Sequence, residues 1–219
     1  MAARSKGASG SARFAPPAGV QARLAGDCRA ARCFERSITA LKLPEPPLSD
    51  GVIVLRGFEP CDIDRLVEIC QDPHISRWTL VPSPYSRQDA CEYLARVSAG
   101  LAAGTRASFA IVDVHDGCVL GTADLMAIDP ALGCCEIGYV LAAPARGRGA
   151  ASRAVELLAG WAFQTLKLNR LELHIDKHNA ASLAVAARTA FQPVAEPVVQ
   201  RAETAHFTDD LFFARTRRR

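Results

Sequence analysis

The stretch EIGYVLAAPARGRGAA, from Glu136 to Ala151, decides the fold of this chain. Its first part is an apolar run typical of a buried strand, and its second part is a glycine turn that opens a strongly apolar helical segment. Such a turn presents free backbone N–H groups, with the positive end of the helix dipole behind them. Gly147 and Gly149 lack a Cβ and permit close approach to the backbone. The pattern favours a pyrophosphate site, and a helix start without any ligand is the structural alternative.

The composition indicates one globular domain with extra length. The chain has 219 residues, of which 49% are hydrophobic and 22% charged, and a formal net charge of +3. Part of that charge sits at the two ends, where aromatic residues hardly interleave with the basic ones. Solvated tails explain such ends better than a nucleic-acid partner does.

The eight cysteines do not predict a metal site or a disulfide framework. No Cys-x-x-Cys or His-x-x-x-His spacing accompanies them, so we expect no metal and a reduced, cytoplasmic compartment. No apolar run reaches the roughly 18 residues of a membrane helix, so no membrane association is expected.

The chain divides into three parts. We expect a disordered, basic and proline-rich extension over residues 1–48, a folded domain over 49–216, and a basic tail over 217–219. Hydrophobic periodicity predicts the elements of the domain. Strands are expected at 52–58, 108–114, 118–127, 134–141, 171–176, 193–199 and 207–216, and helices at about 62–70, 86–97, 149–166 and 179–189. This order describes one mixed α/β domain.

Local signals refine these elements. Asp62 is placed to cap the first helix, and Ser86 with Asp89 resembles a capping box. In the strand at 171–176, apolar residues alternate with Glu172, His174 and Asp176, which predicts a half-buried strand. His174 and His178 are therefore expected at a surface strand end.

Three blocks in the chain resemble, in the same order, those of the GNAT acetyltransferase superfamily. They are Glu136-Ile-Gly-Tyr-Val-Leu141, Arg146-x-x-Gly149-x-Ala151, and Asn179-x-x-Ser182 followed by Ala190-Phe191. The upstream segment that contains Trp78 and Tyr85 resembles the substrate-side loop of the ribosomal-protein N-terminal (RimJ/RimL-type) branch. Ala190 departs from the family's usual glycine, and it would be strained if that position has φ > 0.

The resemblance implies a GNAT-like single domain with a central mixed, splayed sheet of about six to seven strands flanked by helices. Acetyl-CoA would lie between two parallel strands. The implied cofactor contacts are Tyr139, Val140 and Leu141 along the pantetheine arm, Arg146, Gly147, Arg148, Gly149, Ala150 and Ala151 at the pyrophosphate, and Asn179 and Ser182 beyond them.

The family transfers acetyl groups directly to a bound amine, which requires a proton acceptor and a proton donor. Glu136 is the candidate base, directly or through water, and Ser182 the candidate acid, with Tyr139 as an alternative. Each has a structural reading too: Glu136 could face solvent or pair with an arginine, and Asn179 and Ser182 could simply cap a helix. Trp78 and Tyr85 either line an acceptor pocket or anchor their loop.

The leading hypothesis is thus an acetyl-CoA-dependent N-acetyltransferase that acts on a protein N-terminus or a small amine, as a monomer or homodimer. A catalytically silent acyl-CoA-binding module is the alternative. A dinucleotide-binding oxidoreductase is excluded by spacing, because Gly147-x-Gly149-x-x-Ser152 lacks the third glycine or alanine of that fingerprint.

Overall fold

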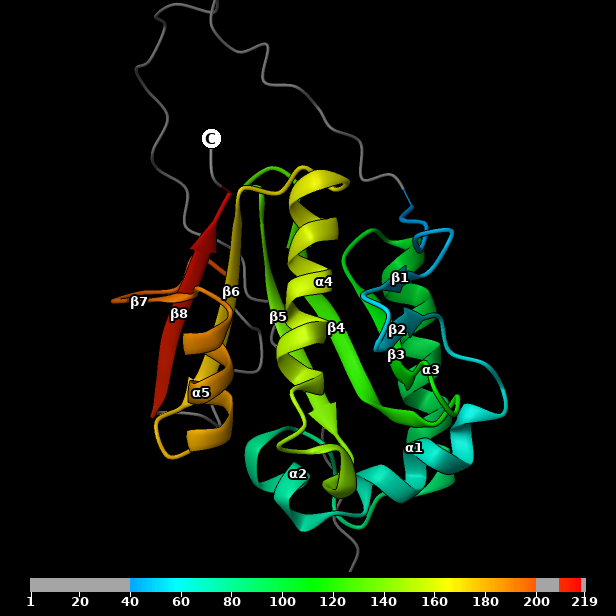
Figure 1. Ribbon diagram of the computed structural model, residues 1–219. Helices are drawn as coiled ribbons and strands as arrows, with labels where there is room; N and C mark the ends of the chain where they lie inside the picture. The colour runs from blue at the N-terminus through cyan, green and yellow to red at the C-terminus, as the bar shows by residue number, and fades with distance from the viewer. Residues whose placement is uncertain (1–39, 200–208, 218–219) are drawn as a thin grey trace, which may run out of the picture. The chain divides into compact units, whose positions relative to one another are not determined.

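The computed structural model describes residues 40–199 and 209–217, which form an eight-stranded sheet covered by helices (Figure 1). The strand order is β1-β2-β3-β4-β5-β6-β8-β7. The strands are β1 (Leu48–Ser49), β2 (Ile53–Arg56), β3 (Ala107–Asp113), β4 (Val119–Asp129), β5 (Cys134–Leu141), β6 (Arg170–Asp176), β7 (Gln192–Val194) and β8 (Asp210–Thr216). The expected mixed α/β fold is confirmed, with slightly more strands than the six to seven predicted.

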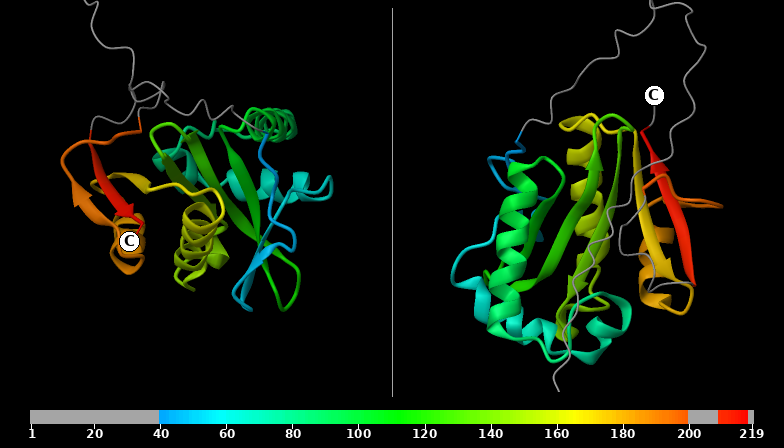
Figure 2. Two further views of the ribbon diagram at one scale, coloured as in Figure 1. Left: turned by 90° about the horizontal axis from the view of Figure 1, so that it is seen from above. Right: turned by 180° about the vertical axis from the view of Figure 1, so that it is seen from behind.

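The helices lie on both faces of the sheet (Figure 2). They are α1 (Asp62–Cys70), α2 (Pro73–Trp78), α3 (Arg87–Ala102), α4 (Ala150–Gln164) and α5 (Ala180–Arg188), with a short 3₁₀ turn η1 (Ala143–Ala145). The first three cover one face, here called the α3 face, and α4 and α5 cover the other, the α4 face. Side chains alternate between the two faces along each strand.

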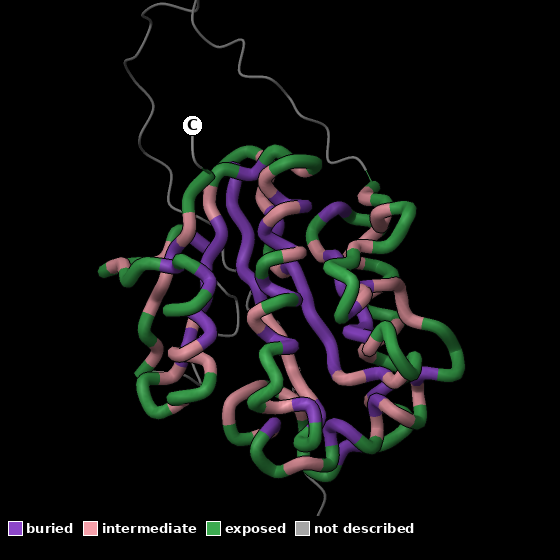
Figure 3. The backbone as a smooth tube through the Cα atoms, in the orientation of Figure 1, coloured by how far each residue is buried: buried purple, intermediate pink, exposed green. Residues whose placement is uncertain are grey.

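The main core lies between the sheet and α4. In Figure 3 the central strands are buried over most of their length. Phe109 of β3 meets Trp161 of α4 edge to face, with ring centroids 5.5 Å apart. As its apolar pattern predicted, α4 is largely buried, because Val155 and Leu158 enter this core. The helix is thereby held against the centre of the sheet.

The sheet contains one short parallel pairing, and it ends early. β5 and β6 pair only from Cys134↔Arg170 to Glu136↔Glu172. Beyond that point β5 continues beside β4 to Leu141, and β6 continues beside β8 to Asp176. Figure 1 shows the two strands diverging toward the starts of α4 and α5. The splayed sheet implied by the resemblance is present, and one edge of residues 137–141 is left without a neighbouring strand.

Several local expectations hold and others need correction. The capping box at Ser86 and Asp89 is formed, and it starts α3. The segment 73–78, read from sequence as part of a loop, is helix α2, with Pro73 at its first turn and Asp72 as its side-chain cap. The chain packs onto the domain from Leu41, whose amide bonds to Leu101, so the folded part begins before residue 49.

The C-terminal strands are shorter than predicted. The candidate at 193–199 reduces to the three residues of β7, and β8 begins at Asp210. The start of the second candidate, 207–208, lies outside the described residues, as do most of the expected N-terminal extension and the last two residues of the basic tail.

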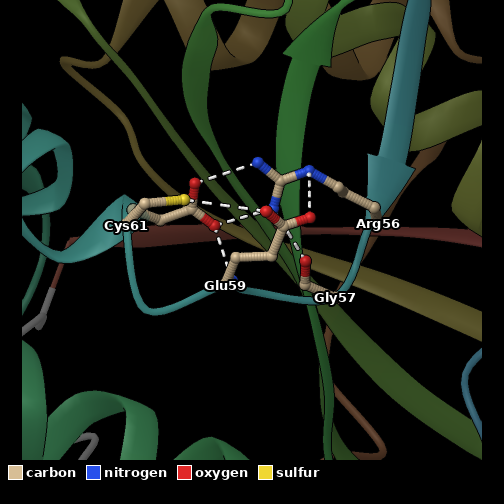
Figure 4. Close-up of polar contacts among 5 residues, drawn as sticks. Arg56, Gly57, Glu59 and Cys61 are labelled. Atoms are coloured by element: carbon tan, nitrogen blue, oxygen red, sulfur yellow. Dashed lines mark hydrogen bonds and ion pairs between the residues drawn. The ribbon is translucent and has the colours of Figure 1, made fainter.

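Asp62 does not cap α1; Cys61 holds the N-cap position, without a side-chain hydrogen bond. The Asp62 carboxylate is buried and instead accepts both guanidinium nitrogens of Arg56, at 2.7 and 2.9 Å, and the Glu59 amide at 2.7 Å. Figure 4 shows Arg56 facing Glu59 and Gly57 across this turn, with Cys61 beside them. A bidentate pair ties α1 to β2 more firmly than a cap would.

Ala190 has φ of +56°, so the position that usually holds glycine in this family is left-handed here as well. The strain anticipated for alanine is therefore present.

We predict that Asp62→Asn destabilises the domain by about 2 kcal/mol at pH 7, because it breaks a buried, charge-assisted pair. Burial raises the pKa of Asp62, but the hydrogen bonds from Arg56 and Glu59 outweigh it and the net pKa is lowered. The carboxylate therefore contributes stability that is fully present above about pH 4 and is lost as the pH falls further. Urea unfolding should show a mutant deficit at pH 7 that shrinks toward pH 3.

The control is Asp64→Asn, two residues along, where the carboxylate is exposed and pairs with exposed Arg87. It should cost less than about 0.5 kcal/mol. Equal costs at the two positions would contradict a special role for Asp62.

We also predict that Ala190→Gly raises the free energy of unfolding by about 0.5 kcal/mol. Relief of left-handed strain outweighs the extra entropy of glycine in the unfolded chain. The matched control, Ala187→Gly on the exposed side of α5, should instead lower it by about 1 kcal/mol. Thermal unfolding measures both, and a drop at residue 190 as large as that at 187 would show that no strain is relieved.

Candidate active site

The turn before α4 is an exposed cradle of backbone amides. Gly147 and Gly149 have φ of +74° and +83°, and a Cβ built on either one would meet no atom within 4 Å. Gly149 is the N-cap of α4 and offers no side-chain cap. Within the described chain, the N–H groups of residues 147–151 donate to no protein acceptor. The cradle therefore suits an anion such as a pyrophosphate.

The Arg146 side chain binds protein groups, although its charge next to the cradle suggests that it would bind an anion. Its guanidinium donates to the Leu141 carbonyl, with Nε and Nη2 at 3.1 and 2.9 Å, and pairs with Asp72 at 2.7 Å. The His74 amide and Arg146 together lower the pKa of Asp72. Arg146 thus joins the end of β5 to the start of α2, and exposed Arg148 is the side chain left to face a bound anion.

The unpaired part of β5 brings two predicted residues together. Tyr139 packs toward the α4 face, where α5 also lies. Burial raises the pKa of Tyr139, and the nearby Ser182 hydroxyl offsets part of that rise. No described group lies within hydrogen-bonding geometry of the Tyr139 hydroxyl. The effect of Ser182 on the pKa of Tyr139 indicates that the two candidate acids, Tyr139 on β5 and Ser182 on α5, lie near each other where the strands separate.

Asn179 caps α5 as its structural reading predicted, because its Oδ1 accepts the Ser182 amide at 3.1 Å. The cap holds Ser182 at the first turn of the helix. The amide nitrogen of Asn179 can still donate to a ligand.

Glu136 is the last residue of β5 that pairs with β6, and the gap between these two strands begins there. It is 1% exposed, so it does not face solvent, and it points to the α3 face, opposite the amide cradle. Its register partner Glu172 is also fully buried. His174, on the same face, has its Nδ1 at 3.9 Å from Glu136 Oε2. Glu136 is thus a buried carboxylate at the start of the gap between β5 and β6, through which the two faces of the sheet are connected.

Glu172 is held by four groups. It accepts Arg170 Nε at 2.5 Å and the amides of Val198 and Val199 at 2.9 and 3.0 Å, and it faces His174 Nε2 at 3.3 Å. Burial raises the pKa of Glu172, but these hydrogen bonds outweigh it and keep the carboxyl ionised.

Sequence reasoning missed Glu172 and misplaced His174. Both side chains are buried, whereas alternation along 171–176 predicted a solvent-facing side. The amides of Val198 and Val199 contact Glu172, and Phe212 of β8 packs on His174. No local signal in the strand itself reveals these contacts. His178 is exposed, as expected.

The two aromatic candidates differ. Tyr85 is 6% exposed among Leu66, Cys70 and Ala90, and burial raises its pKa to about 12, which favours the anchoring interpretation. Trp78 ends α2, is partly exposed and stacks with Arg77 at 4.5 Å. It stays the better candidate for an acceptor contact.

Other chemistries find little support in residues 40–199 and 209–217. Burial raises the pKa of both Cys134 and Cys135, which disfavours a thiolate nucleophile. In the same residues no group of three His, Cys, Asp or Glu side chains could hold a metal. None of the described helices is both long and apolar enough to cross a membrane.

Comparison with known proteins agrees with this geometry. The acetyltransferase (GNAT) domain family matches residues 53–192. A relative from Bacillus licheniformis, named an uncharacterized N-acetyltransferase p20, is 29% identical over 140 residues, which cover 64% of this chain and 79% of that protein.

Solved structures share the fold. Mycobacterium smegmatis RimJ in complex with CoA-disulfide has a TM-score of 0.65 at 23% identity, over 76% of this chain and 82% of that one. Spermidine N-acetyltransferase from Vibrio cholerae, with CoA and spermine, has a TM-score of 0.63 at 17% identity, over 76% and 96%. The expected likeness to the RimJ type is thus confirmed at the level of the fold.

Proposed function

This chain belongs to the GNAT acetyltransferase family, and on that premise we propose that it moves an acetyl group from acetyl-CoA to the primary amine of a peptide N-terminus or a small molecule. The observation that carries the proposal is the early end of the β5–β6 pairing beside an uncapped helix N-terminus. Together they supply backbone partners for an amide-containing arm and for a pyrophosphate.

Acetyl-CoA has two polar regions, the pyrophosphate and the pantetheine arm, and each would bind one set of backbone groups that lack a partner in the described fold. The amides of residues 147–151 would hold the pyrophosphate, assisted by Arg148. The unpaired edge of Tyr139, Val140 and Leu141 would take the pantetheine arm as an added strand would be taken. Asn179 and Ser182 would contact the same ligand from α5.

Acetyl-CoA supplies an activated thioester, so the protein needs mainly to position and to move protons. Glu136 would accept a proton from the incoming amine, which attacks only in its neutral form. Its position at the point of strand separation, on the α3 face, supports approach of the acceptor from that face and of the donor from the α4 face.

Ser182 or Tyr139 would protonate the departing thiolate. The closeness of the two hydroxyls supports them as one donor unit, with Ser182 at the first turn of α5. Burial keeps Tyr139 neutral near pH 7, so its proton stays available.

The acceptor site would lie by α2, where Trp78 is placed. Asp72 caps α2 and also binds Arg146, so a single ion pair links the acceptor side to the cradle.

We predict that Arg148→Glu weakens acetyl-CoA binding about tenfold or more, because it places an anion at the cradle. Acetyl-CoA at 100 times its dissociation constant should stabilise the wild type by about 2.7 kcal/mol, or roughly 5–10 °C. The variant should show a much smaller shift at the same concentration.

Lys167→Glu is the matched charge reversal for that experiment. It is exposed just beyond the far end of α4 and should keep the full ligand-induced shift. No shift in the wild type at saturating acetyl-CoA would rule out the proposed donor.

We predict that Glu136→Gln lowers kcat by about 100-fold or more with little change in acetyl-CoA binding, since it removes the proton acceptor but keeps the shape. Free-thiol release with a panel of peptide and small amines measures turnover, and calorimetry measures binding. Full turnover in the variant would exclude Glu136 as base, whereas binding without turnover in the wild type would indicate the silent acyl-CoA-binding module.

A further inference from the structure

We propose that His174 is a relay residue that takes up, through Glu136, the proton removed from the incoming ammonium group, and that Glu172 holds its ring in place for this purpose. The inference rests on the proposed function, because it assigns a role to groups behind the proposed base. It concerns two side chains, His174 and Glu172, that the sequence pattern placed on the solvent side of their strand.

The geometry places His174 between two buried carboxylates. Its side chain is fully buried, with Nε2 at 3.3 Å from Glu172 Oε2 and Nδ1 at 3.9 Å from Glu136 Oε2. Within the described residues, Nδ1 has no hydrogen-bond partner. Phe212 of β8 packs edge to face on the ring, with centroids 5.0 Å apart, and limits its rotation. The imidazole therefore presents one nitrogen to each carboxylate.

Glu172 sets the state of the ring. Arg170 and the amides of Val198 and Val199 hold its carboxylate ionised and in one orientation. An ionised carboxylate accepts the Nε2 proton, which leaves the Nδ1 lone pair facing Glu136. This is the arrangement in which an oriented histidine can receive a proton at its other nitrogen.

The number of protons released in the reaction requires a second proton acceptor besides Glu136. A primary ammonium group loses two protons as its nitrogen forms the amide bond, while the thioester C–S bond breaks and sulfur gains one. Glu136 can hold only one proton at a time. If it passes the first to His174 Nδ1, it is again a carboxylate when the second must leave. The second proton stays on Glu136 while Ser182 or Tyr139 gives one proton to sulfur. After turnover, Glu136 and the imidazolium each lose a proton to solvent and the hydroxyl regains one, which is a net release of one proton.

The described charged groups around the ring are few. Glu136 faces it from β5, and Glu172 and, beyond it, Arg170 lie on its own strand β6. The register partner of His174 on β8 is the uncharged Phe212. The amides of Val198 and Val199 bind Glu172. A proton placed on Nδ1 would therefore lie between the Glu136 and Glu172 carboxylates.

The decisive variant is His174→Gln. Its side-chain amide can still donate to Glu172 from the Nε2 position but offers no titrating nitrogen to Glu136. With a peptide acceptor whose amine titrates near pH 8, kcat/KM should fall about 10- to 100-fold at pH 7. The deficit should shrink to a few-fold at pH 9, where the amine arrives neutral and the first proton need not be stored. His115→Gln, in the exposed β3–β4 turn, is the matched control and should follow the wild-type profile.

A second readout does not depend on turnover. In ¹⁵N-histidine-labelled protein, the His174 ring signals are assigned by their loss in His174→Gln. We expect Nε2 to carry the ring proton, and we expect Glu136→Gln to move the Nδ1 signal.

The outcomes separate the relay from the proposed function. A His174→Gln profile parallel to that of an active wild type, or an Nδ1 signal unchanged by Glu136→Gln, overturns the relay and leaves the acetyltransferase intact. A wild type that binds acetyl-CoA but acetylates no amine overturns the proposed function, and the relay falls with it.

Discussion

The site depends on one constraint of the sheet: β5 and β6 are parallel neighbours for only three residue pairs. Each then stays with its antiparallel partner, β5 with β4 and β6 with β8, and those longer ladders leave the two strands free to separate. Every buried backbone donor and acceptor requires a partner, so an edge opened inside a sheet is a binding surface. The starts of α4 and α5 stand beside this edge, which gathers amide donors and hydroxyls around one gap.

The two faces of the sheet carry different chemistry. The α4 face is apolar along its core and ends in uncapped amides, which suits a long, partly apolar ligand with a charged end. The α3 face holds buried acidic side chains, including Asp124, whose pKa burial raises although Ser108, Arg106 and Tyr93 contact it. In the proposed mechanism, protons are held on this face and the donor would bind on the other.

Sequence patterns predicted most of the fold, because periodicity, the Ser86–Asp89 capping box and the glycine turn are local signals. They failed where distant segments decide the outcome. The position of Asp62 predicts a helix cap, yet its carboxylate binds the guanidinium group of Arg56. Arg146 carries charge next to the cradle but forms an ion pair with Asp72. His174 and Glu172 alternate with apolar residues as a solvent-facing side would, but segments distant in the sequence contact them: Val198 and Val199 bind Glu172, and Phe212 packs on His174. The residues of the cradle were identifiable; the histidine between two carboxylates was not.

The outer edges of the sheet are short. β1 has two residues and β7 has three, and Pro193 removes one N–H from the latter. Long, unpaired outer edges invite a second molecule to extend the sheet and so promote aggregation. In the described fold, the longest run of unpaired strand backbone instead lies within the sheet, at residues 137–141. The protein can therefore keep strand backbone open for a ligand without presenting the same edge to other copies of itself.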